Sequence, residues 1–359
     1  MNGSVFKHTT IESSRDRRAF IGKLALGAAG TILGMNGLHG PATGSPAEPG
    51  KARVAFVTGN DRRNMVYQAM KPFEKEVKEQ IGRKQVIIKA NLVDPDIDLA
   101  ATHIDAVRGV LDFLTPIYGK RIIVGDSNGR PGGTWESLRN HGYLALEKEY
   151  RVKCADFNED TTTVLWIPGR NCRPLDIEII DRFLDPGNYI ISVTRPKTHS
   201  NAVVTLSVKN IVMGSPVNVI TRKNRMFRGQ KTKMHDAGDK GLNFNIFHFA
   251  QRIRPQFCVI DGLVGMEGNG PSQGTPVEHG FALAGHDMLA VDRVGVELMG
   301  VNFNDIGYLT YLSWADEGQS DLSKIEILGP ALSDHVIRYK LHENIENQMV
   351  WKEGLVIDR

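Results

Sequence analysis

Short apolar segments alternate with helical patterns along most of this chain. Eight segments have the apolar, β-branched composition of buried strands, and they lie at Val54–Val57, Val86–Ile88, Ile122–Val124, Val152–Ala155, Ile190–Val193, Phe257–Ile260, Phe281–Ala284 and Ile325–Leu328. Strands that alternate with helices favour a mainly parallel sheet with helices on both faces. The pattern therefore predicts an α/β fold, and 359 residues fit either one large domain or two lobes.

Residues 102–114 carry the clearest helical pattern. Four apolar positions fall on one face of this helix, namely Ile104, Val107, Leu111 and Leu114. Thr102 and Asp105 are spaced as a capping box, in which each side chain bonds the other residue's backbone N–H. The spacing therefore predicts a helix that begins at Thr102.

The first 47 residues have the layout of an export signal. An Arg17-Arg18 pair precedes a mildly apolar segment at Leu24–Met35, and a stretch rich in small residues and proline follows at Gly37–Gly50. Twelve moderately apolar residues are too few to span a bilayer. We therefore predict a twin-arginine signal peptide and linker over residues 1–47, the twin-arginine export machinery as a partner, and a periplasmic or extracellular mature protein.

Removing this signal changes the charge balance of the protein. Residues 1–47 hold five of the 44 basic and two of the 41 acidic residues, which leaves 39 of each in the mature chain. A neutral chain gives no reason to expect nucleic acid as a partner. No second apolar span follows, so no membrane span is expected in the mature form. We predict a folded α/β domain over residues 51–330 and a C-terminal extension over residues 331–359.

The chain has three cysteines, Cys154, Cys172 and Cys258, and none is in a Cys-x-x-Cys spacing. An ordinary iron–sulfur cluster needs four cysteine ligands, so a cluster of the protein's own is not expected. An oxidising compartment would allow one disulfide with one thiol left over. Cys154 and Cys258 lie in apolar, strand-like segments and are expected in the core.

Polar side chains follow four of the predicted strands. The four sequences are Lys89-Ala90-Asn91, Gly125-Asp126-Ser127, the loop with Arg195, Lys197 and His199, and Asp261-Gly262. Turn chemistry accounts for any one of them alone. Because the carboxyl ends of parallel strands meet at one edge of a sheet, we predict that Asn91, Asp126, His199 and Asp261 line one ligand site.

Lys209 is the charged residue of an otherwise apolar segment, Val203–Met213, which ends at Gly214 as a helix might. A buried, unpaired ammonium is costly. The side chain can relieve that cost by extending along its stem to the surface or by pointing into a polar site. His199 upstream favours the second arrangement, and we predict that Lys209 and His199 face the same cavity.

Two further loops have unusual compositions. Residues 222–233 contain six Lys or Arg and no acid, and His235 and Asp236 follow. This segment is either a solvated loop or a lid over an anionic ligand, with His235 as an acid, a base or a metal ligand. The second loop, Asp261–Pro276, holds Glu267 and five glycines, which would let the backbone approach a ligand closely.

Several of these motifs together resemble the family called domain of unknown function 362. They are Lys89-Ala90-Asn91-Leu92, Gly125-Asp126-Ser127, Pro196-Lys197-Thr198-His199, Val208-Lys209-Asn210, Asp261-Gly262, Gly265–Pro271, Gly285-His286-Asp287 and Ala290-Val291-Asp292. The resemblance runs from about residue 85 to 301. Many relatives carry a ferredoxin-like module with two four-iron clusters, and this chain lacks those cysteines.

The family is also distantly similar to the catalytic part of nickel-pincer lactate racemase. That enzyme holds its nickel–pyridinium cofactor on a lysine preceded by a histidine. The resemblance implies that Lys209 and His199 are the equivalent pair, that His235 is the nickel-ligating histidine, and that the cofactor is nickel-type or another metal cofactor.

These observations leave three functions open. The first is a cofactor- or metal-dependent enzyme that acts on a small anionic, hydroxy-acid-like molecule by proton or hydride transfer. The others are a periplasmic binding or accessory protein without catalysis, and a redox partner of an iron–sulfur subunit. The predicted catalytic residues are His199, Lys197 and His235. The predicted cofactor- or ligand-binding residues are Lys209, Asn91, Asp126, Ser127, Arg195, Asp261 and Glu267, and the predicted metal ligand is His235.

We expect the mature chain to begin between about Thr43 and Lys51. Changing Arg17 and Arg18 to lysine should leave uncut precursor in the cytoplasm, because the twin-arginine pair is what the export machinery reads. Cell fractionation and N-terminal sequencing measure both outcomes. Normal periplasmic delivery of the double variant would contradict the export prediction.

Overall fold

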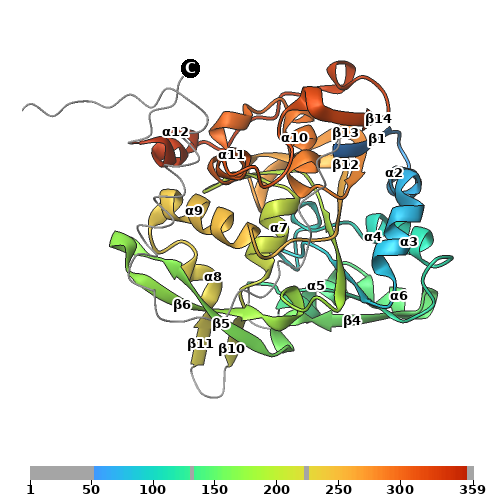
Figure 1. Cartoon of the computed structure of the whole chain (residues 1–359), viewed down its shortest axis with the longest axis horizontal. Helices are drawn as coiled ribbons and strands as arrows, with labels where there is room; N and C mark the ends of the chain where they lie inside the picture. The colour runs from blue at the N-terminus through green and yellow to red at the C-terminus, as the bar shows by residue number, and fades with distance from the viewer. Residues whose placement is uncertain (1–51, 130–132, 222–225, 354–359) are drawn as a thin grey trace, which may run out of the picture.

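The computed structural model describes residues 52–129, 133–221 and 226–353; the predicted signal and its cleavage region lie outside them. One central sheet organises the described chain (Figure 1). Its strands run in the order β14 (Ile325–Leu328), β1 (Ala52–Thr58), β13 (Gln273–Gly285), β12 (Phe257–Asn269), β7 (Asn188–Thr194), β2 (Gln85–Lys89), β3 (Ile122–Asp126) and β4 (Val152–Asp156). Only β13 pairs antiparallel along this path. The mainly parallel α/β prediction is therefore confirmed, with a single sheet at its centre.

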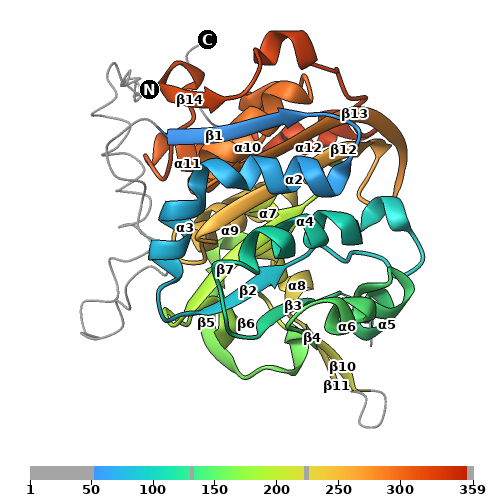
Figure 2. The ribbon, with the colours of Figure 1, turned by 90° about the vertical axis from the view of Figure 1, so that its right-hand side faces the viewer.

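Helices cover both faces of the sheet, as predicted. On one face lie α2 (Arg62–Met70), α3 (Glu74–Ile81) and α4 (Ile104–Leu114), seen in front of the strands in Figure 2. On the other lie α7 (Ser207–Gly214), α9 (Gly238–Ala250), α10 (Met288–Leu298) and α11 (Gly307–Trp314). Successive strand residues such as Ile87 and Ile88 belong to opposite core clusters, because side chains alternate along a strand. No helix of the described chain is long and apolar enough to cross a membrane.

All eight predicted strand segments are strands, but the structure adds hairpins outside this order, two of which form separate two-stranded sheets. They are β5 (Thr162–Pro168) with β6 (Pro174–Ile180), and β10 (Asn218–Thr221) with β11 (Met226–Gly229). β5 is largely exposed, so its composition lacks the apolar signal of a buried strand. Two short helices, α5 (Gly133–Asn140) and α6 (Leu146–Glu149), connect β3 to β4.

The capping box predicted for Thr102 and Asp105 is wrong. α4 begins at Ile104, and its N-cap is His103, whose Nδ1 accepts a hydrogen bond from Asp105 N at 3.1 Å. Thr102 instead joins two strand ends: its Oγ1 accepts from Asn91 N and donates to Val193 O, both at 2.9 Å. Tertiary hydrogen bonds therefore outweigh the local capping preference of this threonine.

The glycine-rich stretch Asp261–Pro276 is a hairpin rather than the predicted loop. β12 and β13 stay paired as far as Asn269 opposite Gln273. Its glycines make room for neighbouring protein: a Cβ at Gly265 would lie 2.1 Å from Tyr339 Oη, and one at Gly270 would lie 2.2 Å from Thr198 O. In this structure the glycines therefore serve close packing of the protein on itself.

The described part of the C-terminal extension packs on the core. It contains α12 (Ile345–Gln348), and Gln348 is fully buried. The Gln348 side chain binds a tight hairpin of two short strands, β8 (Lys197–His199) and β9 (Val203–Thr205). Its Oε1 accepts from Val203 N at 2.7 Å, and its Nε2 donates to His199 O at 2.9 Å. Val203 has a φ of 60°, which is unfavourable for a β-branched residue, so this contact holds a strained turn.

Replacing Gln348 with leucine should destabilise the protein by about 2–4 kcal/mol, because Val203 N–H and His199 C=O would lose their partner inside the core. Urea unfolding measures the change in the free energy of unfolding. A matched control is Gln68→Leu on the exposed side of α2, expected within about 0.5 kcal/mol of wild type. Equal midpoints for the two variants would show that the C-terminal segment does not support the hairpin.

Candidate functional site

The carboxyl ends of the parallel strands bring most of the predicted site residues to one edge. Asp126 ends β3 opposite Asp156 of β4, and Lys89 ends β2 opposite Ser192 of β7. Asp261 directly follows the segment of β12 that pairs with β7. His199 reaches the same end by another route, since β8 pairs with the outer part of β12 at Met266.

A buried ion pair forms the centre of this edge. Lys89 Nζ lies 2.7 Å from Asp126 Oδ1 and donates to Asn210 Oδ1 at 2.6 Å. Asp126 Oδ2 also accepts from Leu92 N at 2.6 Å. Burial lowers the pKa of Lys89, against the opposing effect of Asp126. Burial alone would raise the pKa of Asp126, but the charges of Lys89 and Lys231 offset it and leave the pKa below its usual range, so the carboxylate is ionised.

Asn91 extends this network to Lys197. Lys197 Nζ donates to Asn91 Oδ1 at 2.5 Å and to Ala100 O, and Asn91 Nδ2 donates to Asn210 Oδ1 at 3.0 Å. Burial, followed by the positive charges of Arg195 and Lys209, holds the pKa of Lys197 well below its usual range. Burial and the neighbouring cations therefore both disfavour the charged form of this side chain.

Lys209 lies in α7 and is 7% exposed. Within the described chain its ammonium has no hydrogen-bond or ion-pair partner. Burial, with a contribution from the charge of Lys89, lowers its pKa to about 7. The same charge acts on two rings: burial and then Lys209 lower the pKa of His235 to about 4 and hold that of His199 well below its usual range. The structure thus brings Lys209, His199 and His235 within electrostatic reach of one another.

The His199 ring has a defined tautomer. Its Nδ1 accepts a hydrogen bond from Asn201 N at 3.0 Å. A backbone N–H can only donate, so in the neutral ring the proton is on Nε2. His199 therefore offers a hydrogen-bond donor to a ligand at Nε2. The role of this ring as a catalytic acid or base stays a prediction.

The basic segment before His235 contributes one residue that the sequence prediction missed. Lys231 belongs to the short helix α8 (Gln230–Lys233), and its Nζ donates to Ser127 Oγ at 3.0 Å and to Met213 O at 2.7 Å. Ser127 Oγ in turn donates to Gly214 O. Burial lowers the pKa of Lys231 to about 7 against the opposing charge of Asp126. Residues 222–225 of the predicted lid lie outside the described chain, while Lys231 reaches the strand edge.

Asp261 and Arg195 belong to a second polar group. Alternation along β12 directs Asp261 to the core face covered by α2 and α4. Its Oδ2 accepts from Arg62 Nε at 2.8 Å, a partner that no sequence motif indicated. Arg195 Nη1 donates to Leu99 O at 3.2 Å, while its buried Nε has no partner in the described structure. Burial lowers the pKa of Arg195, and Asp261 opposes that shift.

Glu267 also lies outside the bonded groups of this edge. It lies further along β12, and its Oε2 accepts from Lys340 N at 2.8 Å. In this structure it therefore holds the C-terminal segment against the hairpin. Across the described residues, no three His, Cys, Asp or Glu side chains are grouped as a metal site would need, so metal binding by His235 stays a prediction.

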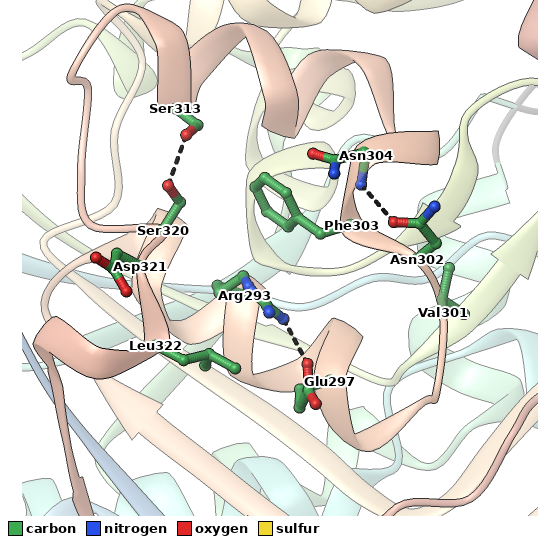
Figure 3. A pocket seen from close by; sticks show the side chains of 10 residues that line it. All are labelled: Arg293, Glu297, Val301, Asn302, Phe303, Asn304, Ser313, Ser320, Asp321 and Leu322. Carbon is green, nitrogen blue, oxygen red and sulfur yellow. Dashed lines mark hydrogen bonds and ion pairs between the residues drawn. The ribbon is translucent and has the colours of Figure 1, made fainter. Parts of the chain in front are cut away.

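A separate cavity of about 510 Å³ lies beside α10 and α11 (Figure 3). Its polar side chains bond mainly to each other: Arg293 Nη1 lies 2.9 Å from Glu297 Oε2, and the Ser313 and Ser320 hydroxyls are 2.6 Å apart. Because these groups are already paired, the cavity is a weaker candidate than the lysine-rich edge.

The structure is that of an α/β protein with several lysines gathered at the carboxyl edge of its sheet. The chain belongs to the family described as "Domain of unknown function (DUF362)", whose model matches residues 86–297. This range contains the residues from Lys89 to Asp261 that form the site. The family resemblance inferred from the sequence motifs is therefore confirmed.

The proteins similar to this chain include one curated relative and one solved structure. A thylakoid-associated protein of Synechocystis sp. is 28% identical over 225 residues, which are 60% of this chain and 63% of that protein. The chain thus spans less than two thirds of the length of this relative. A crystal structure of a protein from Thermotoga maritima has a TM-score of 0.34 and 13% identity, and the match covers 58% of this chain and 52% of that one.

Lys209→Met should stabilise the folded protein at pH 7 by roughly 2–4 kcal/mol. The reason is that the Lys209 amine is protonated in the unfolded chain at this pH, whereas its lower pKa in the folded protein disfavours the protonated form. The pKa falls from 10.5 to about 7 on folding, so the difference should be largest below pH 7. It should shrink as the pH rises toward 10.5, where both states are uncharged.

Urea unfolding of both proteins at several pH values measures this difference. The control is Lys240→Met, since Lys240 is exposed and should show no such pH dependence. A Lys209→Met variant that is less stable than wild type at pH 7 would show that the ammonium has a partner.

Proposed function

We propose that the lysine-rich edge binds a small carboxylate-bearing molecule and transfers a proton at a carbon atom next to its carboxylate. The observation that carries this proposal is the unpartnered amine of the buried Lys209, beside the buried Lys89 and Lys197 and the half-buried Lys231. In the described chain, Asp126 is the carboxylate that forms an ion pair with this group. An anionic ligand would compensate the remaining positive charge.

The proposed roles follow from the hydrogen bonds already made. Lys231 and the Nε2–H of His199 donate to the oxygen atoms of the anion. Lys209 has no bond to break and is half-protonated near neutral pH, so it accepts and returns the proton. A group with a pKa near the working pH is the most effective acid–base catalyst.

Hydride transfer at a hydroxy-acid carbon would require a cofactor, such as the nickel-type group implied by the likeness to lactate racemase. His235 is the predicted ligand for such a metal, and it lies near Lys209. The described residues do not bring three His, Cys, Asp or Glu side chains together. The proton-transfer version of the proposal therefore rests on lysine and histidine alone.

We also propose that the protein acts outside the cytoplasm after twin-arginine export. The support is the Arg17-Arg18 pair and the apolar segment at Leu24–Met35. Export of folded proteins by this route suits a site that is assembled or loaded before transport.

A binding or accessory protein without catalysis is the second candidate. The observation that favours it is that Lys89, Lys197 and Lys231 already donate to protein acceptors, as recognition groups do. A third candidate, a redox partner of an iron–sulfur subunit, would depend on clusters supplied by another chain. Cys154 and Cys258 are buried and Cys172 is exposed, and all three are free thiols.

Calorimetric titration with L-lactate, L-malate and oxalate tests the anion site. We expect at least one of these to bind, and Lys209→Met and Lys231→Met to weaken it by about tenfold or more, as the loss of a charge-assisted hydrogen bond implies. Binding should weaken as the pH rises from about 6 to 8, because in the absence of ligand the amines of Lys209 and Lys231 lose their protons near pH 7.

Lys240→Met is again the matched control and should bind like wild type. Metal analysis and intact mass of the protein purified from its own host separate the candidate functions: bound metal or a mass adduct favours a cofactor-dependent enzyme. Binding that is unchanged in both lysine variants would place the ligand elsewhere and refute the site.

A further inference from the structure

Lys209 differs from the other lysines of this edge in what its amine contacts. The amines of Lys89, Lys197 and Lys231 each donate to acceptors within the protein. In the described structure the Lys209 amine has none, although the side chain is 7% exposed. Its nitrogen lone pair is therefore free to react once the proton has left.

The position of Lys209 is fixed from both sides along α7. Asp292 Oδ1 and Oδ2 accept hydrogen bonds from Ser207 N and Val208 N at 2.8 and 2.9 Å, which anchors the start of the helix. On the other side Asn210 bonds to Lys89 and Ser192. Reactive groups need this kind of placement, since a shift of about 1 Å can reduce a rate about a hundredfold.

We propose that Lys209 Nζ is a nucleophile that forms an imine with the carbonyl carbon of a small 2-oxo acid. This inference rests on the proposed anion site, because the carboxylate of the oxo acid would be held by the donors described for that site. It adds a covalent step and names the ligand class. The imine would acidify C3 of the oxo acid, the carbon next to the imine carbon, and Lys209 would then act as the nucleophile in place of the acid–base role given above.

The step balances without any further reactant. The amine lone pair attacks the carbonyl carbon and a C–N bond forms. The C=O double bond becomes a single bond, and the carbonyl oxygen takes up one proton from the nitrogen to become a hydroxyl. Loss of this hydroxyl as water, with the second proton from the nitrogen, gives the C=N bond. Hydrolysis reverses both stages and returns the free lysine.

The surroundings of Lys209 favour this chemistry over simple charge pairing. A lysine becomes nucleophilic when it is desolvated or lies beside another cation, and both conditions hold here. Lys209 is buried within α7. The second condition is met by Lys89, which is paired with Asp126 and whose charge lowers the pKa of Lys209. Lys231 is a matched comparison: burial also lowers its pKa to about 7, but its amine is engaged by Ser127 and Met213.

Reductive trapping tests the proposal. The mature protein is incubated with pyruvate or 2-oxoglutarate and sodium cyanoborohydride, and the products are measured by intact mass and peptide mapping. We expect a pyruvate adduct of about 72 Da, the mass left after water is lost and the imine is reduced, on Lys209. The adduct should be at least tenfold less abundant on Lys231.

Two variants separate the covalent step from anion binding. Lys209→Arg keeps the positive charge but cannot form an imine, so it should bind pyruvate by calorimetry and give no adduct. Lys209→Met should give no adduct either, and thermal melting confirms that both variants fold. Lys240→Met should be trapped like wild type.

Four outcomes would overturn the inference. An adduct of equal yield in wild type and Lys209→Arg would assign the reactivity to another lysine. Pyruvate binding without trapping in wild type would refute imine formation and leave the anion site standing. If neither oxo acid binds but other carboxylates do, 2-oxo acids are excluded as the ligand class. If no carboxylate binds, the proposed function is refuted as well.

Discussion

The buried ion pair between Lys89 and Asp126 is the interaction on which the carboxyl edge of the sheet depends. It joins the ends of β2 and β3, and through Asn210 it joins both to α7. Removing one partner of a buried pair typically costs about 3–5 kcal/mol, because the other charge is left without compensation. Gly214 makes the pair sterically feasible, since a Cβ there would lie 2.3 Å from Lys89 Cε. The ion pair therefore ties two strand ends and a helix together at the centre of this edge.

The excess of lysines over carboxylates at this edge is its most informative chemical feature. Several lysines are gathered around one paired carboxylate, and the pKa values of Lys209 and Lys231 both fall to about 7. Structural networks usually balance their charges. An arrangement that leaves an amine such as Lys209 without a partner is instead typical of a site whose missing partner is a ligand.

The C-terminal segment supports this edge from outside. Gln348 bonds to both ends of the turn between β8 and β9, and Asn344 Nδ2 donates to Ser200 O at 2.8 Å. His342 lies near enough for its charge to affect His199. The family match ends at residue 297, so a part of the chain beyond it positions a residue of the predicted site. Residues 331–353 thus belong structurally to the site and not to a separate appendage.

Much of the fold was determined by the sequence itself. Buried parallel strands are runs of apolar, β-branched residues, so segments such as Ile190–Val193 could be identified directly. Parallel order then implied that Asn91, Asp126 and Asp261 would share an edge, and the apolar surroundings of Lys209 singled it out as a lysine that either extends to the surface or faces a polar site. Only the tertiary structure decided which charges meet. Arg62 pairs with Asp261, and Lys231 reaches Ser127 over 104 residues of chain. Such contacts depend on how distant segments pack, and local spacing does not encode them.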